Sequence, residues 1–159
     1  MNSIHQTPFV LSIICILLIS CTKEDIPLPG IYKATFDGSY TKNDTVYKLV
    51  REQPIFIISA TENQINFSHS FTGYEQGTVS SSLTKYDKNK VNGVLFLPYD
   101  HGGGSYMSND IEVDGKIEKI SKNNYVITGT HTYIYTEIIP ENQLILKHNV
   151  MGEYKIVKN

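Results

Sequence analysis

The amino-acid sequence predicts an all-β protein whose strands form a single antiparallel meander closed into a small barrel, with a β-sandwich as the alternative. Residues 30–159 contain only two alanines, whereas Ile, Val, Thr and Tyr, which favour strands, are plentiful. Apolar and polar residues alternate in several segments, such as 64–72 and 111–118, and no segment sustains the spacing of an amphipathic helix. The fold class therefore rests on composition and on a two-residue period.

This alternation predicts ten strands near residues 30–40, 45–51, 54–60, 64–72, 77–86, 91–97, 107–120, 124–136, 143–149 and 152–158. Turn-forming residues fall between most of them, for example at 42–44 and 122–124. Asp114-Gly115 leaves open whether residues 107–120 form one bulged strand or a hairpin. Eight to ten strands with such short connections are expected to pair with their sequence neighbours, and they must close or stack to bury their apolar faces.

An apolar segment precedes the predicted sheet. Residues 9–19 carry no charge, and as a helix they would reach about 16 Å, which is too short for a bilayer core but typical of a signal peptide. The segment ends at Leu18-Ile19-Ser20-Cys21, which resembles the lipobox of a bacterial lipoprotein. That resemblance implies a removed signal peptide over 1–20, a lipid on Cys21, an extended tether over 21–29 and a domain over 30–159. An uncleaved anchor with an incidental cysteine is the alternative.

Two short motifs bear on location and modification. Lys23-Glu24-Asp25 resembles the export tag of some Gram-negative surface lipoproteins, and Thr22 resembles the residue that sends lipoproteins to the outer membrane. The resemblance implies lipid anchoring in the outer membrane of a Gram-negative cell envelope, with surface display favoured over the periplasmic face; an ordinary polar linker is the alternative. Asp44-Thr45-Val46 resembles an O-glycosylation site of exported proteins, which would make Thr45 the modified residue.

Charge and cysteine content exclude several function classes. The formal net charge is −2 and no basic cluster occurs, so nucleic acid is not an expected partner. Removal of Cys15 with the signal leaves Cys21 as the one cysteine, so neither a disulfide nor a thiol nucleophile is expected. His101-Gly102-Gly103-Gly104 resembles an oxyanion loop of esterases, but the Gly-x-Ser-x-Gly motif is missing. We therefore expect no enzyme, no cofactor and no metal site.

The two ends of the predicted sheet resemble lipocalin-like (calycin-type) barrels. Gly30-Ile31-Tyr32 is similar to their Gly-x-Trp opening, and Gly152-Glu153-Tyr154-Lys155-Ile156 to the last strand of small bacterial lipocalin-like lipoproteins. The chain has no tryptophan and a single arginine, Arg51, so the family's packing of Trp beneath Arg is absent. The resemblance therefore concerns architecture and implies no particular ligand.

Aromatic and histidine side chains share faces on two predicted strands. His131, Tyr133 and Tyr135 alternate with threonines, and His69 lies between Phe67 and Phe71. In the structural interpretation these six residues belong to the core; in the functional one they line a ligand cavity. The second interpretation predicts a tethered module that binds a small apolar or amphipathic ligand or a glycan. The alternative is a solid-core lipoprotein that docks an envelope protein through its outer face or loops.

Overall fold

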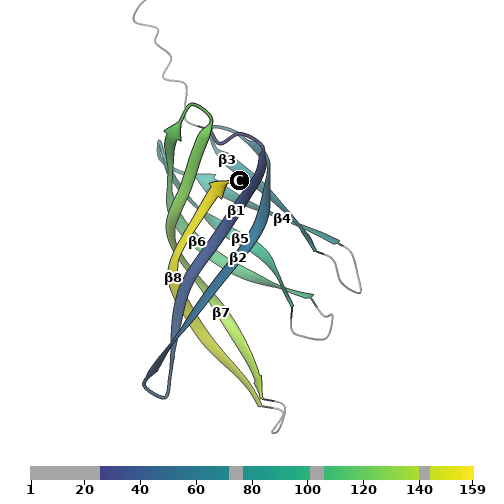
Figure 1. Ribbon diagram of the computed structural model, residues 1–159, viewed down its shortest axis with the longest axis vertical. Coiled ribbons are helices and arrows are strands. Elements are labelled where there is room, and N and C mark those ends of the chain that lie inside the picture. The colour runs from purple at the N-terminus through teal and green to yellow at the C-terminus, as the bar shows by residue number, and fades with distance from the viewer. Residues whose placement is uncertain (1–25, 72–76, 101–105, 140–143) are drawn as a thin grey trace, which may run out of the picture.

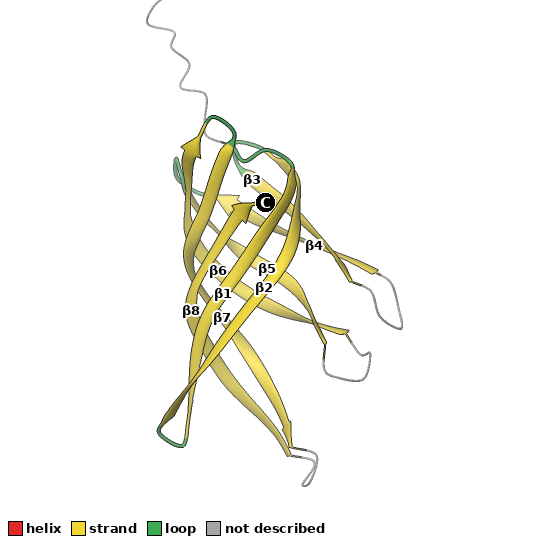
Figure 2. Cartoon of the chain, viewed as in Figure 1, coloured by secondary structure: helices red, strands yellow, loops and turns green. Residues whose placement is uncertain are grey.

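The computed structural model describes residues 26–71, 77–100, 106–139 and 144–159, and these form eight strands (Figures 1 and 2). The strands are β1 (Gly30–Lys42), β2 (Thr45–Ala60), β3 (Gln64–Phe71), β4 (Gly77–Lys85), β5 (Lys90–Asp100), β6 (Tyr106–Ser121), β7 (Asn124–Ile139) and β8 (Leu144–Lys158). Each strand pairs antiparallel with its sequence neighbour, and β1 also pairs with β8. The predicted all-β closed meander is confirmed, and the sandwich alternative is wrong because all eight strands belong to one closed sheet.

Two predicted strand breaks are wrong. Residues 45–51 and 54–60 fall within the single strand β2, and residues 144–149 and 152–158 within β8, residue 143 lying outside the described residues. Pro54 is tolerated because β2 pairs with β3 only from Phe56 onward, so the proline lies where one edge of β2 is free. Asp114-Gly115 lies within the single strand β6, so no hairpin forms there.

The ring has two different ends. The chain enters at residues 26–29, and this end, here called the tether end, also holds the β2–β3, β4–β5 and β6–β7 turns and residue 159 (Figure 1). The opposite end, here called the hairpin end, holds the β1–β2 turn and the ends of the paired strands β3 and β4, β5 and β6, and β7 and β8. In an antiparallel meander, successive connections alternate between the two ends of the sheet.

Strands of neighbouring hairpins pair only toward the tether end. Within hairpins the pairing is long: β7 and β8, for example, pair from Val126 to Ile139. Between hairpins the pairing stops before the hairpin end. β2 pairs with β3 only over Phe56–Ala60 and β4 with β5 only over Ser82–Lys85, whereas β6 pairs with β7 from Glu112 onward and β1 with β8 as far as Ser39. The sheet is thus a closed ring in its tether half, and its hairpins diverge in the other half (Figure 2). The ring is not regular enough along its length to be called a barrel.

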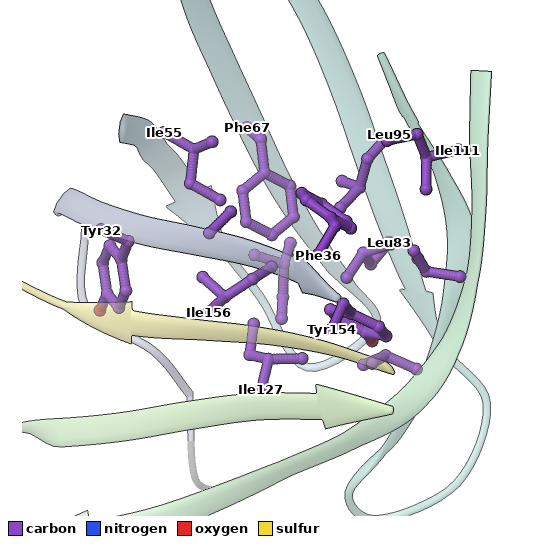
Figure 3. Packing of buried hydrophobic residues seen from close by; sticks show 14 of the residues in the cluster. Tyr32, Phe36, Ile55, Phe67, Leu83, Leu95, Ile111, Ile127, Tyr154 and Ile156 are labelled. Carbon is purple, nitrogen blue, oxygen red and sulfur yellow. The ribbon is translucent and has the colours of Figure 1, made fainter. Parts of the chain in front are cut away.

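The interior of the ring is filled by apolar side chains from every strand (Figure 3). The largest of those that are almost fully buried are Tyr32, Tyr154, Phe36, Phe67, Ile55, Ile57, Ile65, Leu83, Leu95, Ile111 and Ile127. The Tyr32 hydroxyl donates a hydrogen bond to the Leu28 carbonyl at 2.7 Å, which fastens the incoming chain to β1. Burial of this cluster is the main stabilising contribution.

Glycines allow the sheet to bend sharply where it closes. Gly38 of β1 lies opposite Gly152 of β8, and Gly115 of β6 lies opposite Gly129 of β7. A Cβ atom on Gly152 would lie 2.0 Å from the Asp37 carbonyl oxygen and 2.4 Å from the Gly38 Cα. At Gly152 the backbones of β1 and β8 approach too closely for any side chain, so a glycine there permits the pairing that closes the ring.

No helix formed by the described residues is long and apolar enough to cross a membrane.

Candidate functional site

The aromatic face predicted for β7 points into the ring. His131 is 2% exposed and Tyr133 6%, whereas Thr130 and Thr132 are exposed. Tyr135, farther along the strand, is half-buried and packs against the core. The predicted orientation is confirmed, and its cause is the two-residue period, which gives the buried face to the rings and leaves the smaller hydroxylated side chains to solvent.

His131 is held by aromatic packing. Its ring meets Phe36 edge-on with centroids 5.4 Å apart and stacks on Tyr133 at 5.7 Å. Neither ring nitrogen has a hydrogen-bond partner among the described residues. Burial lowers the pKa of His131, and the nearby backbone and charge of Asp37 oppose this only in part. The imidazole is therefore neutral at physiological pH, and it acts as a core residue that retains hydrogen-bonding capacity.

The second predicted group, on β3, is also buried where the structure describes it. Phe67 is fully buried and His69 is 2% exposed. The His69 Nε2 atom has no hydrogen-bond partner among the described residues. The side chain of Phe71, at the end of β3, lies outside the described part of the chain. Phe67 and His69 thus belong to the packed interior, as the structural interpretation expects.

Burial of His69 predicts acid sensitivity. Desolvation lowers the pKa of His69 to about 4, although a backbone hydrogen bond to Pro54 opposes the shift. An unfolded histidine titrates near 6.5, so between these values only the unfolded chain binds the proton. Lowering the pH from about 6.5 to about 4 should therefore remove about 2–3 kcal/mol of stability through this residue. Urea unfolding of the wild type and His69→Gln at both pH values measures it; an unchanged pH dependence in the variant would contradict the prediction.

Toward the hairpin end, the inner face gathers rings from four strands. Tyr40 of β1 stacks on Tyr47 of β2, with centroids 5.2 Å apart and planes 14° apart. Tyr40 also lies 4.5 Å from the His148 ring of β8 and 5.6 Å from the Tyr135 ring of β7. Tyr47 is 43% exposed. We call Tyr40, Tyr47, Tyr135 and His148 the aromatic group; it reaches solvent through Tyr47.

An ion-pair network borders the aromatic group. Lys42 Nζ donates hydrogen bonds to both carboxylate oxygens of Glu137, at 3.0 and 2.8 Å. His148 Nε2 lies 3.0 Å from Glu137 Oε2. These hydrogen bonds, first from Lys42 and then from His148, lower the pKa of Glu137, and the Glu137 hydrogen bond raises the pKa of Lys42. The network joins β1 to β7 and β8 where these strands diverge, so it holds the aromatic group together.

Arg51 contributes a cation deeper on the same inner face. Its guanidinium carbon lies 5.8 Å from the centroid of the Tyr133 ring. A guanidinium has five N–H donors, so it can lie over a ring and still donate to a ligand oxygen. Flat rings with flanking cations suit a ligand that has a ring of its own and a polar or anionic substituent.

Sequence reasoning missed Tyr40, Tyr47, His148 and the network because they lie on four strands. The alternation within each strand could have predicted that these side chains face inward. Tyr40, for example, continues the inward-facing series of Phe36 and Gly38 on β1. Which strands would meet at the hairpin end could not be derived from that series alone.

Grooves on the outer surface do not coincide with the predicted ligand residues. One of about 700 Å³ crosses the outer face of β3, β4 and β5 and is lined mainly by Ser, Thr, Asn and apolar residues. Another of about 430 Å³ lies over β6, β7 and β8. Of the six predicted ligand residues, Phe67 borders the first and Tyr133 the second.

The remaining predicted positions are distributed as follows. Cys21 and residues 22–25 lie outside the described residues. Thr45 is exposed at the start of β2, directly after the Asn43-Asp44 turn, whose two residues have φ of 49° and 60°. Such a pair is typical of a tight type I′ hairpin turn. Within the described ranges, no three His, Cys, Asp or Glu side chains gather as a metal site would require.

Comparison with known proteins identifies no family for this chain. No protein-family profile matches the chain, and no curated protein matches it. A crystal structure from Bacteroides ovatus, described as a structural-genomics protein of unknown function, is similar with a TM-score of 0.41 and 9% sequence identity. The similarity covers 81% of this chain and 40% of that one, so this chain spans well under half of the other protein's length.

Proposed function

We propose that this protein is a lipid-anchored module of the Gram-negative cell envelope that binds a small amphipathic ligand. The ligand has a ring that stacks on Tyr47 and Tyr40 and a polar or anionic group that meets Arg51. Catalysis is not part of the proposal.

One observation carries this proposal: the aromatic group is exposed to solvent through Tyr47, while the described inner face nearer the tether end is packed. A stacked, partly exposed tyrosine pair offers apolar surface with polar hydroxyls, which is the combination that ligand sites use. The aromatic group lies at the hairpin end, and the chain enters at the tether end. A lipid on Cys21 would therefore leave the binding face directed away from the membrane.

A fluorescent probe tests the binding site. Anilinonaphthalene sulfonate is an amphipathic, anionic aromatic compound that becomes fluorescent in apolar surroundings. We expect saturable binding to the wild type and a loss of affinity of about tenfold in Tyr47→Ala, because one stacking ring contributes roughly 1 kcal/mol or more. Fluorescence titration measures both affinities.

Matched variants separate ring stacking from general apolar binding. Tyr86→Ala removes a tyrosine that is 50% exposed but lies at the tether end, so its affinity for the probe should equal that of the wild type. An equal loss in Tyr86→Ala and Tyr47→Ala would contradict the proposed site.

The outer face of β7 and β8 supports the alternative function. Ile134, Ile138, Ile145 and Met151 are each more than half exposed there, and Ile138 lies directly opposite Ile145. Exposed apolar patches often mark protein interfaces. If the Ile138→Ser/Ile145→Ser double variant loses probe binding while Tyr47→Ala retains it, an interaction lipoprotein is favoured over a ligand-binding module.

The anchor is tested by Cys21→Ser. Without the thiol no lipid can be attached, so the variant should leave the membrane fraction. A Cys21→Ser protein that remains membrane-bound at its original length would contradict the lipoprotein assignment.

A further inference from the structure

The tether end carries exposed apolar side chains around its rim. Ile120 is 63% exposed, Ile58 55% and Tyr86 50%, and each lies next to a different turn of this end. Ile31 and Leu28, where the chain enters, are 49% and 41% exposed. These side chains come from separate parts of the sequence, and the meander places all of them at one end of the ring.

The same rim is basic. Lys88 and Lys90 flank the β4–β5 turn, Lys119 and Lys122 flank the β6–β7 turn, and all four are exposed. Lys116, opposite Lys90, and Lys158 lie at the same end, so six solvent-accessible lysines outnumber the four acidic residues there, which are Glu62, Asp87, Asp114 and Glu118. The formal net charge of the chain is −2, so the acidic excess lies elsewhere.

From these two observations we propose that the tether end of the ring rests on a bilayer surface, with Ile120 and Tyr86 at the headgroup level and the surrounding lysines on anionic headgroups. This orientation rests on the proposed anchoring at Cys21. The tether predicted over residues 21–29 would span roughly 25 Å if extended at about 3.1 Å per residue, so a lipid on Cys21 would hold this end close to the bilayer. Apolar side chains interspersed with lysines are the combination that binds such interfaces, and each lysine near an anionic surface adds attraction.

The outer patch on β7 and β8 is the competing surface. Ile134 is 51% exposed there and lies about ten residues, or roughly 33 Å, along β7 from the tether end. A molecule resting on its side would bring Ile134 to the lipid, whereas one resting on its tether end would keep Ile134 in water. The two orientations therefore differ at a single measurable position.

The absence of tryptophan makes the test direct. Ile120→Trp and Ile134→Trp each introduce the one tryptophan of the chain at a comparably exposed site. The full lipidated chain is reconstituted into vesicles of phosphatidylglycerol and brominated phosphatidylcholine, whose bromine quenches indole emission at close range. We expect strong quenching and a blue shift for Ile120→Trp, and emission for Ile134→Trp close to that in unbrominated vesicles. Quenching of Ile134→Trp, or of neither variant, in vesicle-bound protein would overturn the orientation.

Two further experiments test separately the contribution of the lysines to the quenching and the lipid anchor at Cys21. Adding Lys119→Glu and Lys122→Glu to Ile120→Trp should reduce the quenching by about half or more at low salt, and this effect should vanish in vesicles without phosphatidylglycerol. An identical loss in both vesicle types would contradict the role given to the lysines. Flotation of the vesicles reports the anchor independently: wild type that floats no better than Cys21→Ser would contradict the anchoring itself, and the orientation with it.

Discussion

Replacement of Phe67 by alanine should cost about 3–5 kcal/mol of unfolding free energy. Phe67 is fully buried in the interior cluster, on the same face of β3 as the fully buried Ile65, and it pairs with Ile57 of β2 (Figure 3). Deleting the ring removes apolar contacts and leaves a space that a closed sheet cannot easily collapse to fill. Chemical denaturation of the wild type and Phe67→Ala measures the difference.

The neighbouring strand supplies a control of the same residue type. Phe56 of β2 lies one residue from the Ile57–Phe67 pair but faces outward and is 40% exposed. Phe56→Ala should therefore cost less than about 1 kcal/mol, as surface substitutions usually do. Equal losses in Phe56→Ala and Phe67→Ala would show that the face of β3 has been assigned incorrectly.

Gly152→Ala should cost about 3 kcal/mol or more of unfolding free energy, because the added methyl group would meet rigid backbone rather than a movable side chain. The collision is with Asp37 and Gly38 of β1, so the expected lesion is loss of the β1–β8 pairing that closes the ring. Hydrogen exchange should show reduced protection of the paired amides in both strands, alongside a lower melting temperature.

Met151→Ala is the matched control for Gly152→Ala. Met151 is the preceding residue on β8, is 63% exposed and pairs with Ser39 of β1. Its truncation leaves the backbone approach unchanged, so both stability and amide protection should stay near wild type. If Gly152→Ala behaves like Met151→Ala, close backbone approach is not what permits closure.

The candidate site shows what an alternating pattern within one strand can and cannot predict. The alternation of His131, Tyr133 and Tyr135 with threonines correctly predicted which side chains face inward, because that period is a property of one strand. It did not distinguish the packed part of the inner face, which holds His131 and Tyr133, from the exposed part near Tyr47. That difference depends on where neighbouring hairpins stop pairing.

The sequence by itself determined the fold class, the turns at 42–44 and 122–124 and the inward faces of the strands, since each depends on residues close together in the chain. Only the tertiary structure decided the number of strands. Whether Pro54 or Gly152 ends a strand depends on how closely the neighbouring strands approach and pair at that position. The tertiary structure also decided the composition of the aromatic group and of the Lys42–Glu137 ion pair, whose members are 95 residues apart. Such contacts depend on which distant strands close the ring and on how far along their length they stay paired, and a two-residue period carries no information about either.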